Sequence, residues 1–553
     1  MLQYRIVHRR SIMKKLISVF LCIVMAALTI VPCFAADTAD GEVPVIMIRG
    51  DAEHIFGADG TEVYPLNINT KEIGKDIAGA VFPYYPNALF FNKWEEYYEA
   101  LAAVPAKYFK NAMLDENGEA SNGSGISAQA KKEMAESALR DTKKINGHYA
   151  LRDYQLRYDW RLDPLYVAKQ LHEYIEQVKE TTGAKKVSLY GVCLGGVFIL
   201  AYLGKYGSDG IKSVFFDSTV GNGCELYSDL ITGKMEIDVK AVNRYYADAA
   251  NPTNGAGPQI LKNMDEFVRE FIGATVDVMV KNGTLKVGVD CITSIYEMFY
   301  EEMTPRFVMA SLGTWPGYWG TVKAADYQAA IKMVFGEEGS KMRTQYAGLI
   351  EKLDEYDRVV RQRIPEILLT AKENGCRVGV IAKYGYQQIP IYEGSSRPGD
   401  DIVAFDTASF GATTSSVAGQ FDDAYVNARI AEGKGKYISP DRQIDLSTAL
   451  FPETTWAERG LRHGAWPYQI EDLALRFLES DTEFTNETDP NFPAFLKHIP
   501  STGEIVPMEG EPTDIMNWEF GEEKTGIKGL LKAVLRWFKA LFRLIENRMA
   551  KEK

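Results

Sequence analysis

Cysteine is scarce in this chain, with six in 553 residues. Domains that rely on disulfides are dense in cysteine, so a disulfide scaffold is excluded and stability must come from a buried core. Apolar residues make up 46% of the sequence and aromatic residues 12%, which is enough for a large core and too much for a disordered chain. At most one bridge is expected, among Cys224, Cys291 and Cys376, and the sequence does not choose it.

Basic residues are also in deficit. The chain has 62 Lys and Arg against 75 Asp and Glu, a net charge of −13. Proteins that bind nucleic acids neutralise phosphates with basic surfaces, so this balance argues against a nucleic-acid partner. No motif indicates a metal or an organic cofactor.

Long apolar runs are absent after the first 35 residues. Within those residues, Lys14 and Lys15 precede an apolar stretch that ends at the small-x-small pattern Cys33-Phe34-Ala35. This order is typical of a secretory signal peptide, so we predict cleavage after Ala35 and a secreted protein. No other stretch is long enough to span a membrane.

Strand and helix patterns alternate along much of the chain. This alternation predicts an α/β fold with a parallel sheet and helices on both faces. Strands are expected at 43–50, 154–160, 185–190, 211–219, 377–384 and 453–459, and helices at 93–111, 164–182, 197–206 and 466–480.

The alternation stops between residues 221 and 375, where helical periods dominate near 258–282, 286–303, 322–335 and 345–373. Since the sheet pattern returns afterwards, we interpret 221–375 as a helical lid inserted between two core parts, 36–220 and 376–500. The alternative is a separate domain with no role at the site.

A tight strand-to-helix turn carries the strongest motif. Gly191-Val192-Cys193-Leu194-Gly195 has the spacing glycine-x-nucleophile-x-glycine, which is the nucleophile elbow of α/β hydrolases. The turn is strained and its flanking positions must be glycine, while the following helix N-terminus favours an anion. Serine is the usual nucleophile, and here it is Cys193. The plainer alternatives are a buried structural cysteine or a catalytically silent relative of the fold.

The partners of Cys193 are expected in the order nucleophile, acid, histidine. Only His463 and His498 follow the predicted lid. His463 lies in a loop between the last strand and the last large helix, where a general base belongs, whereas His498 lies in a proline-flanked coil. The acid should follow the strand 377–384, which favours Asp400, with its neighbour Asp401 as the fallback.

An oxyanion hole needs two backbone N–H donors. One is expected from Leu194, directly after the nucleophile, and the other from Asp51, in the loop after the first strand. Arg49-Gly50-Asp51 also spells a cell-adhesion tripeptide, but a turn at the end of a strand explains it better.

Several segments together resemble the lecithin:cholesterol acyltransferase and lysosomal phospholipase family. The segments are YDWRLDP (158–164) with the elbow about 30 residues on, ASLGTWPGYWG (310–320), ADYQAAIKMVFG (325–336) and PGDDIV (398–403). The resemblance implies an α/β-hydrolase fold with a lid, activity on lipid acyl esters, and Asp400 as the acid. The lid aromatics Trp315, Tyr318 and Trp319 are candidates to line an acyl site, although core packing explains them about as well.

Two features depart from that family. Its nucleophile is serine, whereas GVCLGG around Cys193 resembles the cysteine elbows of dienelactone hydrolase and, more loosely, polyhydroxyalkanoate synthase. Its lid disulfide also has no counterpart here. A Cys193–His463 pair would form a thioester, and thioesters transfer readily to amines and thiols, so an acyltransferase is as reasonable as a hydrolase.

The last 28 residues, 526–553, have the sequence pattern of a basic amphipathic helix. They hold eight basic and two acidic residues, with the apolar residues on one helical stripe. This pattern favours an anionic membrane surface as a partner, with docking on the chain's own acidic body as the alternative. Residues 501–525 are predicted to be an acidic linker.

The sequence therefore predicts a secreted α/β hydrolase with a Cys193–His463–Asp400 triad acting on lipid acyl esters by hydrolysis or acyl transfer. The alternative is a catalytically silent protein that keeps the fold and binds lipid or a surface.

Overall fold

The computed structural model describes residues 42–66, 70–234, 236–238, 240–242, 244–245 and 300–510. The predicted leader (1–35), the predicted basic helix (526–553), the linker beyond residue 510 and most of the helical periods between 258 and 303 lie outside these residues. Within the described ranges, no helix is both long and apolar enough to cross a membrane.

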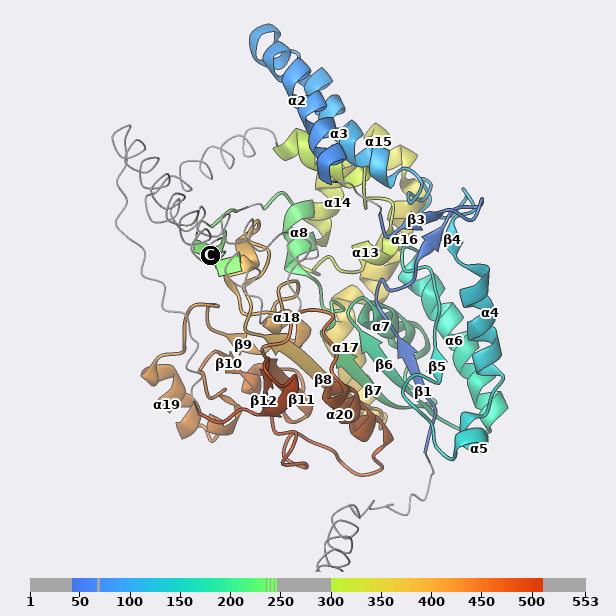
Figure 1. Cartoon of the computed structure of the whole chain (residues 1–553), viewed down its shortest axis with the longest axis vertical. Helices are drawn as coiled ribbons and strands as arrows, with labels where there is room; N and C mark the ends of the chain where they lie inside the picture. The colour runs from blue at the N-terminus through green and yellow to red at the C-terminus, as the bar shows by residue number, and fades with distance from the viewer. Residues whose placement is uncertain are drawn as a thin grey trace, which may run out of the picture. The chain divides into compact units, whose positions relative to one another are not determined.

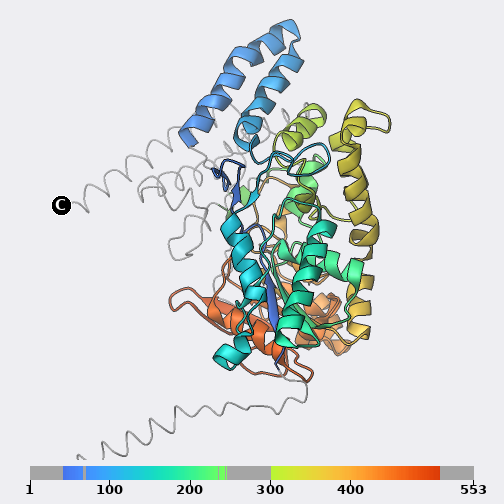
Figure 2. The same cartoon turned by 90° about the vertical axis from the view of Figure 1, so that its right-hand side faces the viewer.

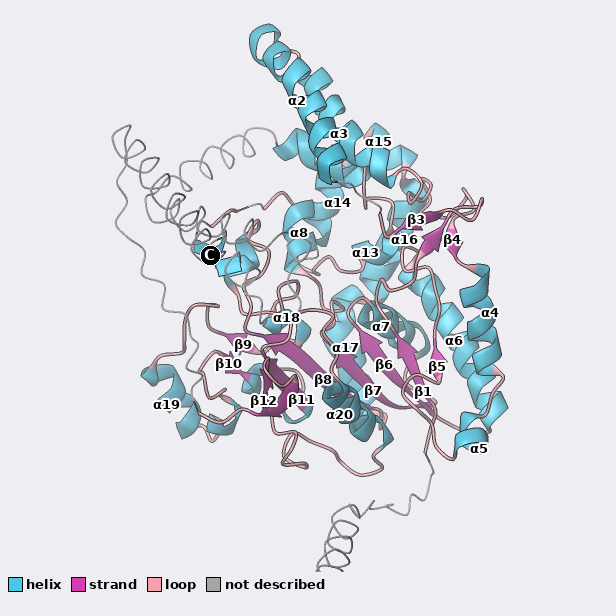
Figure 3. Cartoon of the chain, viewed as in Figure 1, coloured by secondary structure: helices cyan, strands magenta, loops and turns pink. Residues whose placement is uncertain are grey.

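An eight-stranded sheet organises the described chain, in the order β13-β12-β11-β8-β7-β6-β1-β5 (Figure 3). Neighbouring strands are parallel except for β12 and β13 at one edge. The strands are β1 Val45–Ile48, β5 Tyr154–Gln155, β6 Val187–Val192, β7 Ile211–Asp217, β8 Arg377–Tyr384, β11 Thr455–Arg459, β12 Phe495–Ile499 and β13 Glu504–Pro507. This sheet with its helices confirms the predicted α/β-hydrolase class.

Helices cover both faces of the sheet (Figure 1). Successive residues of β1 show how: Ile46 and Ile48 join the core beneath α6 and α7, while Val45 and Met47 join the core beneath α20. The larger helices are α2 Thr70–Phe91, α3 Trp94–Phe109, α4 Ala128–Ala138, α6 Pro164–Thr182, α7 Gly195–Tyr206, α14 Tyr327–Phe335, α16 Ala347–Val359, α17 Ile364–Glu373, α19 Asp423–Ala431 and α20 Tyr468–Glu479; shorter ones are α5 Thr142–Asn146, α8 Glu225–Ile231, α13 Pro316–Trp319, α15 Lys341–Gln345 and α18 Phe405–Ala408.

Helix α6 shows why the sequence gives these elements. The Asp163 side chain accepts a hydrogen bond from the Leu165 N–H at 3.0 Å, and Pro164 occupies the first turn, where its missing donor costs nothing. The helix ends at Gly183, which adopts the left-handed conformation (φ 73°). The predicted bounds 164–182 match the observed helix.

The predicted lid lies between β7 and β8, and its described part is helical. The last helices before the predicted boundary at residue 375, α16 and α17, pack on α7, and α17 also packs on β8. A crossover between parallel strands normally lays its helix against the sheet, and α17 is that helix. These two helices therefore belong to the core.

The sheet also continues past the predicted core boundary at residue 500. His498 lies in β12 and pairs with Ile505 of β13, so the prediction of a coil at His498 and of a linker starting at 501 was wrong. A short edge strand with polar residues carries little periodic signal, and nearby prolines obscured it.

Helices α2 and α3 form an antiparallel pair, side by side in both views (Figures 1 and 2). Asp76 of α2 joins them by accepting hydrogen bonds from Lys107 at 2.6 Å and Tyr108 at 2.7 Å. The sequence pattern predicts α3 but not α2, which contains Pro83 and Pro86. Two small sheets hold the remaining strands. One has the order β3-β2-β4 and consists of Glu62–Tyr64, Ile55–Phe56 and Gly125–Ile126. The other pairs β10, Ile444–Asp445, with β9, Thr413–Thr414.

Candidate active site

Cys193 occupies the tight turn between β6 and α7. Its φ is +53°, a conformation that residues other than glycine rarely adopt. The turn is closed by the Cys193 N–H, which donates to the Asp217 carbonyl at 3.0 Å, and by the Gly196 N–H, which donates to the Cys193 carbonyl at 3.1 Å. Glycine is required at 195, because a Cβ there would lie 2.0 Å from the Ile48 carbonyl oxygen.

The three predicted triad residues lie in one hydrogen-bonded line. His463 Nε2 is 3.0 Å from Cys193 Sγ, and His463 Nδ1 is 2.8 Å from Asp400 Oδ2. The other carboxylate oxygen, Asp400 Oδ1, accepts the N–H groups of Ile402 at 3.2 Å and Val403 at 2.8 Å. The side chain of Asp400 is 2% exposed and that of His463 15%, so the histidine–carboxylate contact is shielded while the histidine stays reachable.

The electrostatics of this line favour a protonated His463. Burial by itself lowers the pKa of His463, but the charge of Asp400, the charge of Cys193 and hydrogen bonds to both raise that pKa well above its usual value. A protonated imidazole stabilises a thiolate, which is the reactive form of cysteine.

Asp401 has a different partner from Asp400. It adopts a left-handed backbone (φ +82°) and accepts a hydrogen bond from Arg462 at 2.7 Å. Burial, together with the charge of Asp400, raises the pKa of Asp401 to about 6. Of the two candidates, the structure brings Asp400 to the histidine and gives Asp401 a different partner.

The loop that carries His463 is held on both sides by buried polar groups. Before it, the Leu461 N–H donates to Glu458 at 3.1 Å, and the guanidinium of Arg462 lies 4.1 Å from the ring centre of Tyr386. After it, Lys383 donates to the Ala465 carbonyl at 3.0 Å. No sequence pattern predicts these groups.

The predicted oxyanion donors lie beside Cys193. A Cβ on Gly50 would lie 3.1 Å from the Leu194 nitrogen and 3.4 Å from Cys193 Sγ, so the loop after β1 passes directly over the nucleophile. Among the hydrogen bonds of the described residues, neither the Leu194 N–H nor the Asp51 N–H has an acceptor. Two backbone N–H groups without a protein acceptor are what an oxyanion hole requires.

The three lid aromatics have different surroundings. Tyr318 donates a hydrogen bond to the Asp51 carboxylate at 2.7 Å, which connects the lid to the oxyanion loop. Trp315 is fully buried, and its ring lies 5.6 Å from that of Tyr318. Trp319 packs in a separate cluster, stacked on Phe335 at 5.6 Å. The Trp319 ring therefore packs against Phe335 within the insertion, and its role at an acyl site stays a prediction.

The YDWR segment has a structural role. Arg161 is fully buried and donates two hydrogen bonds to Asp159, at 2.9 and 2.6 Å, and one to the Ala112 carbonyl at 2.8 Å. Gly317 of the lid segment lies so close to this turn that a Cβ would be 1.9 Å from the Trp160 carbonyl oxygen. The motif thus joins the core to the lid segment 310–320.

Three cysteines are described, and all are free: Cys193, Cys224 and Cys376. Cys224 and Cys376 are buried, and burial raises the pKa of both thiols, to about 12 for Cys376. Among the described residues, no group of three or more His, Cys, Asp or Glu is arranged to hold a metal ion.

The fold is that of the α/β hydrolases. Residues 159–357 match the family described as "alpha/beta hydrolase fold", which supports a hydrolase-type function. No curated protein matches the chain. One similar solved structure is that of the Tle4–Tli4 complex, 12% identical over 66% of this chain and 89% of that chain, with a TM-score of 0.26. Another is the structure of a protein from Burkholderia cenocepacia proposed to be an aryl esterase. It is 13% identical, covers 43% of this chain and 87% of that chain, and has a TM-score of 0.13.

Proposed function

We propose that this protein is a secreted acyl-ester hydrolase or acyltransferase that acts on lipid esters through a covalent thioester on Cys193. The observation that carries the proposal is the line Cys193–His463–Asp400, with 3.0 Å from sulfur to imidazole and 2.8 Å from imidazole to carboxylate. A cysteine, a base within hydrogen-bond reach and an acid that orients the base are the requirements of nucleophilic acyl transfer.

The reaction follows from this geometry. His463 Nε2 takes the thiol proton, and the Cys193 sulfur attacks the ester carbonyl carbon. The oxyanion that forms accepts hydrogen bonds from the N–H groups of Asp51 and Leu194. As the carbon–oxygen bond of the ester breaks, His463 gives its proton to the leaving alcohol. Water or another acceptor, deprotonated by His463, then attacks the thioester and releases the acyl group.

A lipid substrate is supported by exposed apolar side chains. On α2, the side chains of Phe90 and Phe91 are 76% and 71% exposed, and Phe82 and Leu89 are also exposed. Large exposed aromatics that gather on one helix are typical of surfaces that meet membranes or partners. The basic amphipathic pattern at 526–553 favours an anionic surface, and the leader pattern at 1–35 favours secretion.

The acyl-enzyme is tested by incubating the purified mature protein with p-nitrophenyl butyrate. We expect a burst of p-nitrophenol and an intact mass increased by one butyryl group, both lost in Cys193→Ala. No burst and no adduct, with or without liposomes, would overturn the proposal in favour of a silent lipid- or surface-binding protein. Activity that appears only in Cys193→Ser would show that the natural cysteine silences a serine-type site.

The membrane contact is tested by co-sedimentation with phosphatidylglycerol and phosphatidylcholine vesicles. Burying a phenylalanine contributes about 1.5–3 kcal/mol, so Phe90→Ser and Phe91→Ser should each weaken partitioning about tenfold or more. Trp537→Glu should weaken binding to the anionic vesicles. Ile430→Ser removes an apolar side chain that is 58% exposed on α19 and is the matched control. Equal binding by all variants would contradict the lipid-surface assignment.

A further inference from the structure

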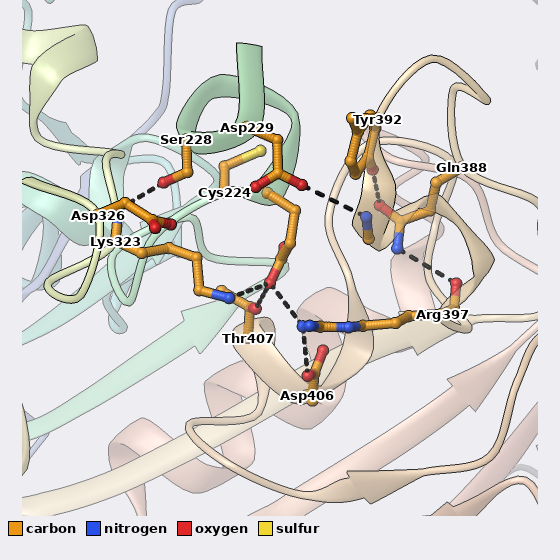
Figure 4. A network of polar contacts seen from close by, with 12 residues as sticks. Cys224, Ser228, Asp229, Lys323, Asp326, Gln388, Tyr392, Arg397, Asp406 and Thr407 are labelled. Atoms are coloured by element: carbon orange, nitrogen blue, oxygen red, sulfur yellow. Dashed lines mark hydrogen bonds and ion pairs between the residues drawn. The ribbon is translucent and has the colours of Figure 1, made fainter. Parts of the chain in front are cut away.

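A buried carboxylate lies outside the triad and is used by none of the steps above. Glu225 is the first residue of α8 and is 2% exposed. Its Oε1 accepts hydrogen bonds from Lys323 Nζ at 2.9 Å, Arg397 Nη1 at 3.1 Å and Thr407 Oγ1 at 2.5 Å. In Figure 4, the side chains of Lys323, Arg397 and Thr407 converge on one point, although they come from two separate segments of the chain.

Two of these partners stand at the two ends of the turn that carries the acid. The segment 398–405 folds back on itself: the Phe405 N–H donates to the Pro398 carbonyl at 2.8 Å, and the Asp400 N–H donates to the Val403 carbonyl at 3.3 Å. Arg397 precedes this turn and Thr407 follows it closely. Glu225 therefore holds both ends of the turn, and an ion pair of 2.9 Å between Arg397 and Asp406 closes its base.

The neighbour of Glu225 contacts the tip of the same turn. Cys224 Sγ lies 3.7 Å from the Ile402 carbonyl oxygen, and the Ile402 N–H donates to Asp400 Oδ1 at 3.2 Å. The start of α8 thus contacts the turn at its base through Glu225 and at its tip through Cys224. Few degrees of freedom remain for the Asp400 carboxylate that faces His463.

The third partner belongs to the insertion. Lys323 follows the lid segment 310–320, and its backbone N–H donates to Ser228 of α8 at 2.7 Å. Burial by itself raises the pKa of the Glu225 carboxyl, but Lys323, Thr407 and Arg397 together hold it below its usual value. Glu225 is therefore an anion whose stability depends on a lysine from the insertion and an arginine from the acid turn.

We infer that Glu225 is a positioning residue: it sets the orientation of Asp400 toward His463 and connects that orientation, through Lys323, to the lid segment 310–320. This inference rests on the proposed function, because it assigns a role within the same triad. Misplacing a catalytic group by about 1 Å costs on the order of 100-fold in rate, so a residue that fixes the acid turn has a large effect without touching substrate.

The variants are Glu225→Gln, which keeps the shape and an acceptor oxygen, and Lys323→Met. Lys234→Met is the matched control, because it breaks an ion pair of 2.6 Å with Asp326 between the same parts of the chain but touches no residue of the acid turn. The full mature chain is used throughout, and the melting temperature of each variant is recorded.

The first readout is the rate of Cys193 acylation by p-nitrophenyl butyrate. We expect Glu225→Gln to lower the acylation rate at saturating ester about tenfold with little change in KM. Lys323→Met should have a smaller effect in the same direction, and Lys234→Met none.

The second readout is the pH dependence of Cys193 alkylation by iodoacetamide, which needs no substrate. A loosened Asp400 no longer raises the pKa of His463 fully, so less imidazolium stabilises the thiolate at a given pH. The half-maximum of the alkylation rate should move to higher pH in Glu225→Gln. A role in stability alone would lower the melting temperature and leave this midpoint in place.

The outcomes separate the two proposals. Wild-type acylation with an unchanged rate and midpoint in Glu225→Gln would overturn the positioning role and leave the proposed function intact. Absence of acylation and of rapid alkylation in the wild type would overturn both. A shifted midpoint in Glu225→Gln but not in Lys323→Met would retain the positioning role and remove the connection to the lid segment 310–320.

Discussion

Replacing His463 by alanine should slow acylation of Cys193 by about 10²- to 10⁴-fold, the usual contribution of a positioned acid–base group. The imidazole has two tasks that no other described side chain performs on Cys193: it takes the thiol proton at 3.0 Å and returns it to the leaving alcohol. The rate is measured from the burst with p-nitrophenyl butyrate and from the intact mass of the acyl adduct.

The same variant should change how alkylation depends on pH. In the wild type the raised pKa of His463 favours an imidazolium next to the Cys193 sulfur, so iodoacetamide should react faster at neutral pH than in a variant that lacks the imidazole. In His463→Ala the rate should rise only through the range of an unassisted thiol, about pH 8–9. Asp400→Asn should shift the profile the same way, because it removes the charge that raises the pKa of His463.

His498→Ala is the control for this prediction. His498 lies in β12 and pairs with Ile505 at the sheet edge, so its removal should leave the acylation rate and the alkylation profile unchanged. Equal reactivity of Cys193 in the wild type and in His463→Ala would show that the 3.0 Å contact has no chemical consequence, and would favour a binding protein.

The parts of the site that could be predicted are those that local geometry or chain order determines. The elbow is local: the strained φ of Cys193 and the closeness of Gly195 to Ile48 leave a recognisable spacing in the sequence. His463 and Asp400 were found because the fold places the acid and the histidine after successive strands. The choice between Asp400 and Asp401 was harder, since adjacent carboxylates differ only in the direction of their side chains.

The supporting residues could not be predicted, because their partners are distant in sequence. Glu225 meets Arg397 and Thr407 across 172 and 182 residues, and no spacing rule connects them. Lys383 lies inside a strand that was predicted correctly, yet its charge carried no signal of a buried partner. The role of Trp319 is open for a related reason: an aromatic residue near a glycine-rich turn has the same sequence pattern whether it lines a pocket or packs in a core.

Replacing Lys383 by methionine should destabilise the protein by about 3–5 kcal/mol, the usual cost of leaving one partner of a buried ion pair alone. Lys383 Nζ is 2.8 Å from Asp217 Oδ1, and the two side chains are 2% and 0% exposed. Asp217 also accepts a hydrogen bond from Tyr190 at 2.8 Å, so a methionine at 383 would leave a desolvated carboxylate without its cation. The measurement is urea unfolding followed by tryptophan fluorescence.

The double variant Lys383→Met/Asp217→Asn makes this prediction specific. Removing both charges removes the unpaired carboxylate, so the double variant should be less destabilised than the sum of the two single variants, by about 1–3 kcal/mol.

Lys332→Met is the matched control. Lys332 pairs with Glu337 at 2.6 Å, but the two side chains are 65% and 75% exposed. Its loss should cost less than about 1 kcal/mol. Equal losses of unfolding free energy for Lys383→Met and Lys332→Met would show that burial of an ion pair does not determine its contribution to stability.

The Lys383 ion pair also bears on the reaction, because it joins the two loops of the triad. The Asp217 backbone carbonyl accepts the Cys193 N–H at 3.0 Å, and Lys383 Nζ donates to the Ala465 carbonyl, two residues after His463, at 3.0 Å. Lys383→Met should therefore slow alkylation of Cys193 at neutral pH at temperatures where the protein is still folded. If stability falls but alkylation is unchanged, this ion pair only stabilises the core. If alkylation slows while the protein is still folded, the ion pair also sets the distance between the sulfur and the imidazole.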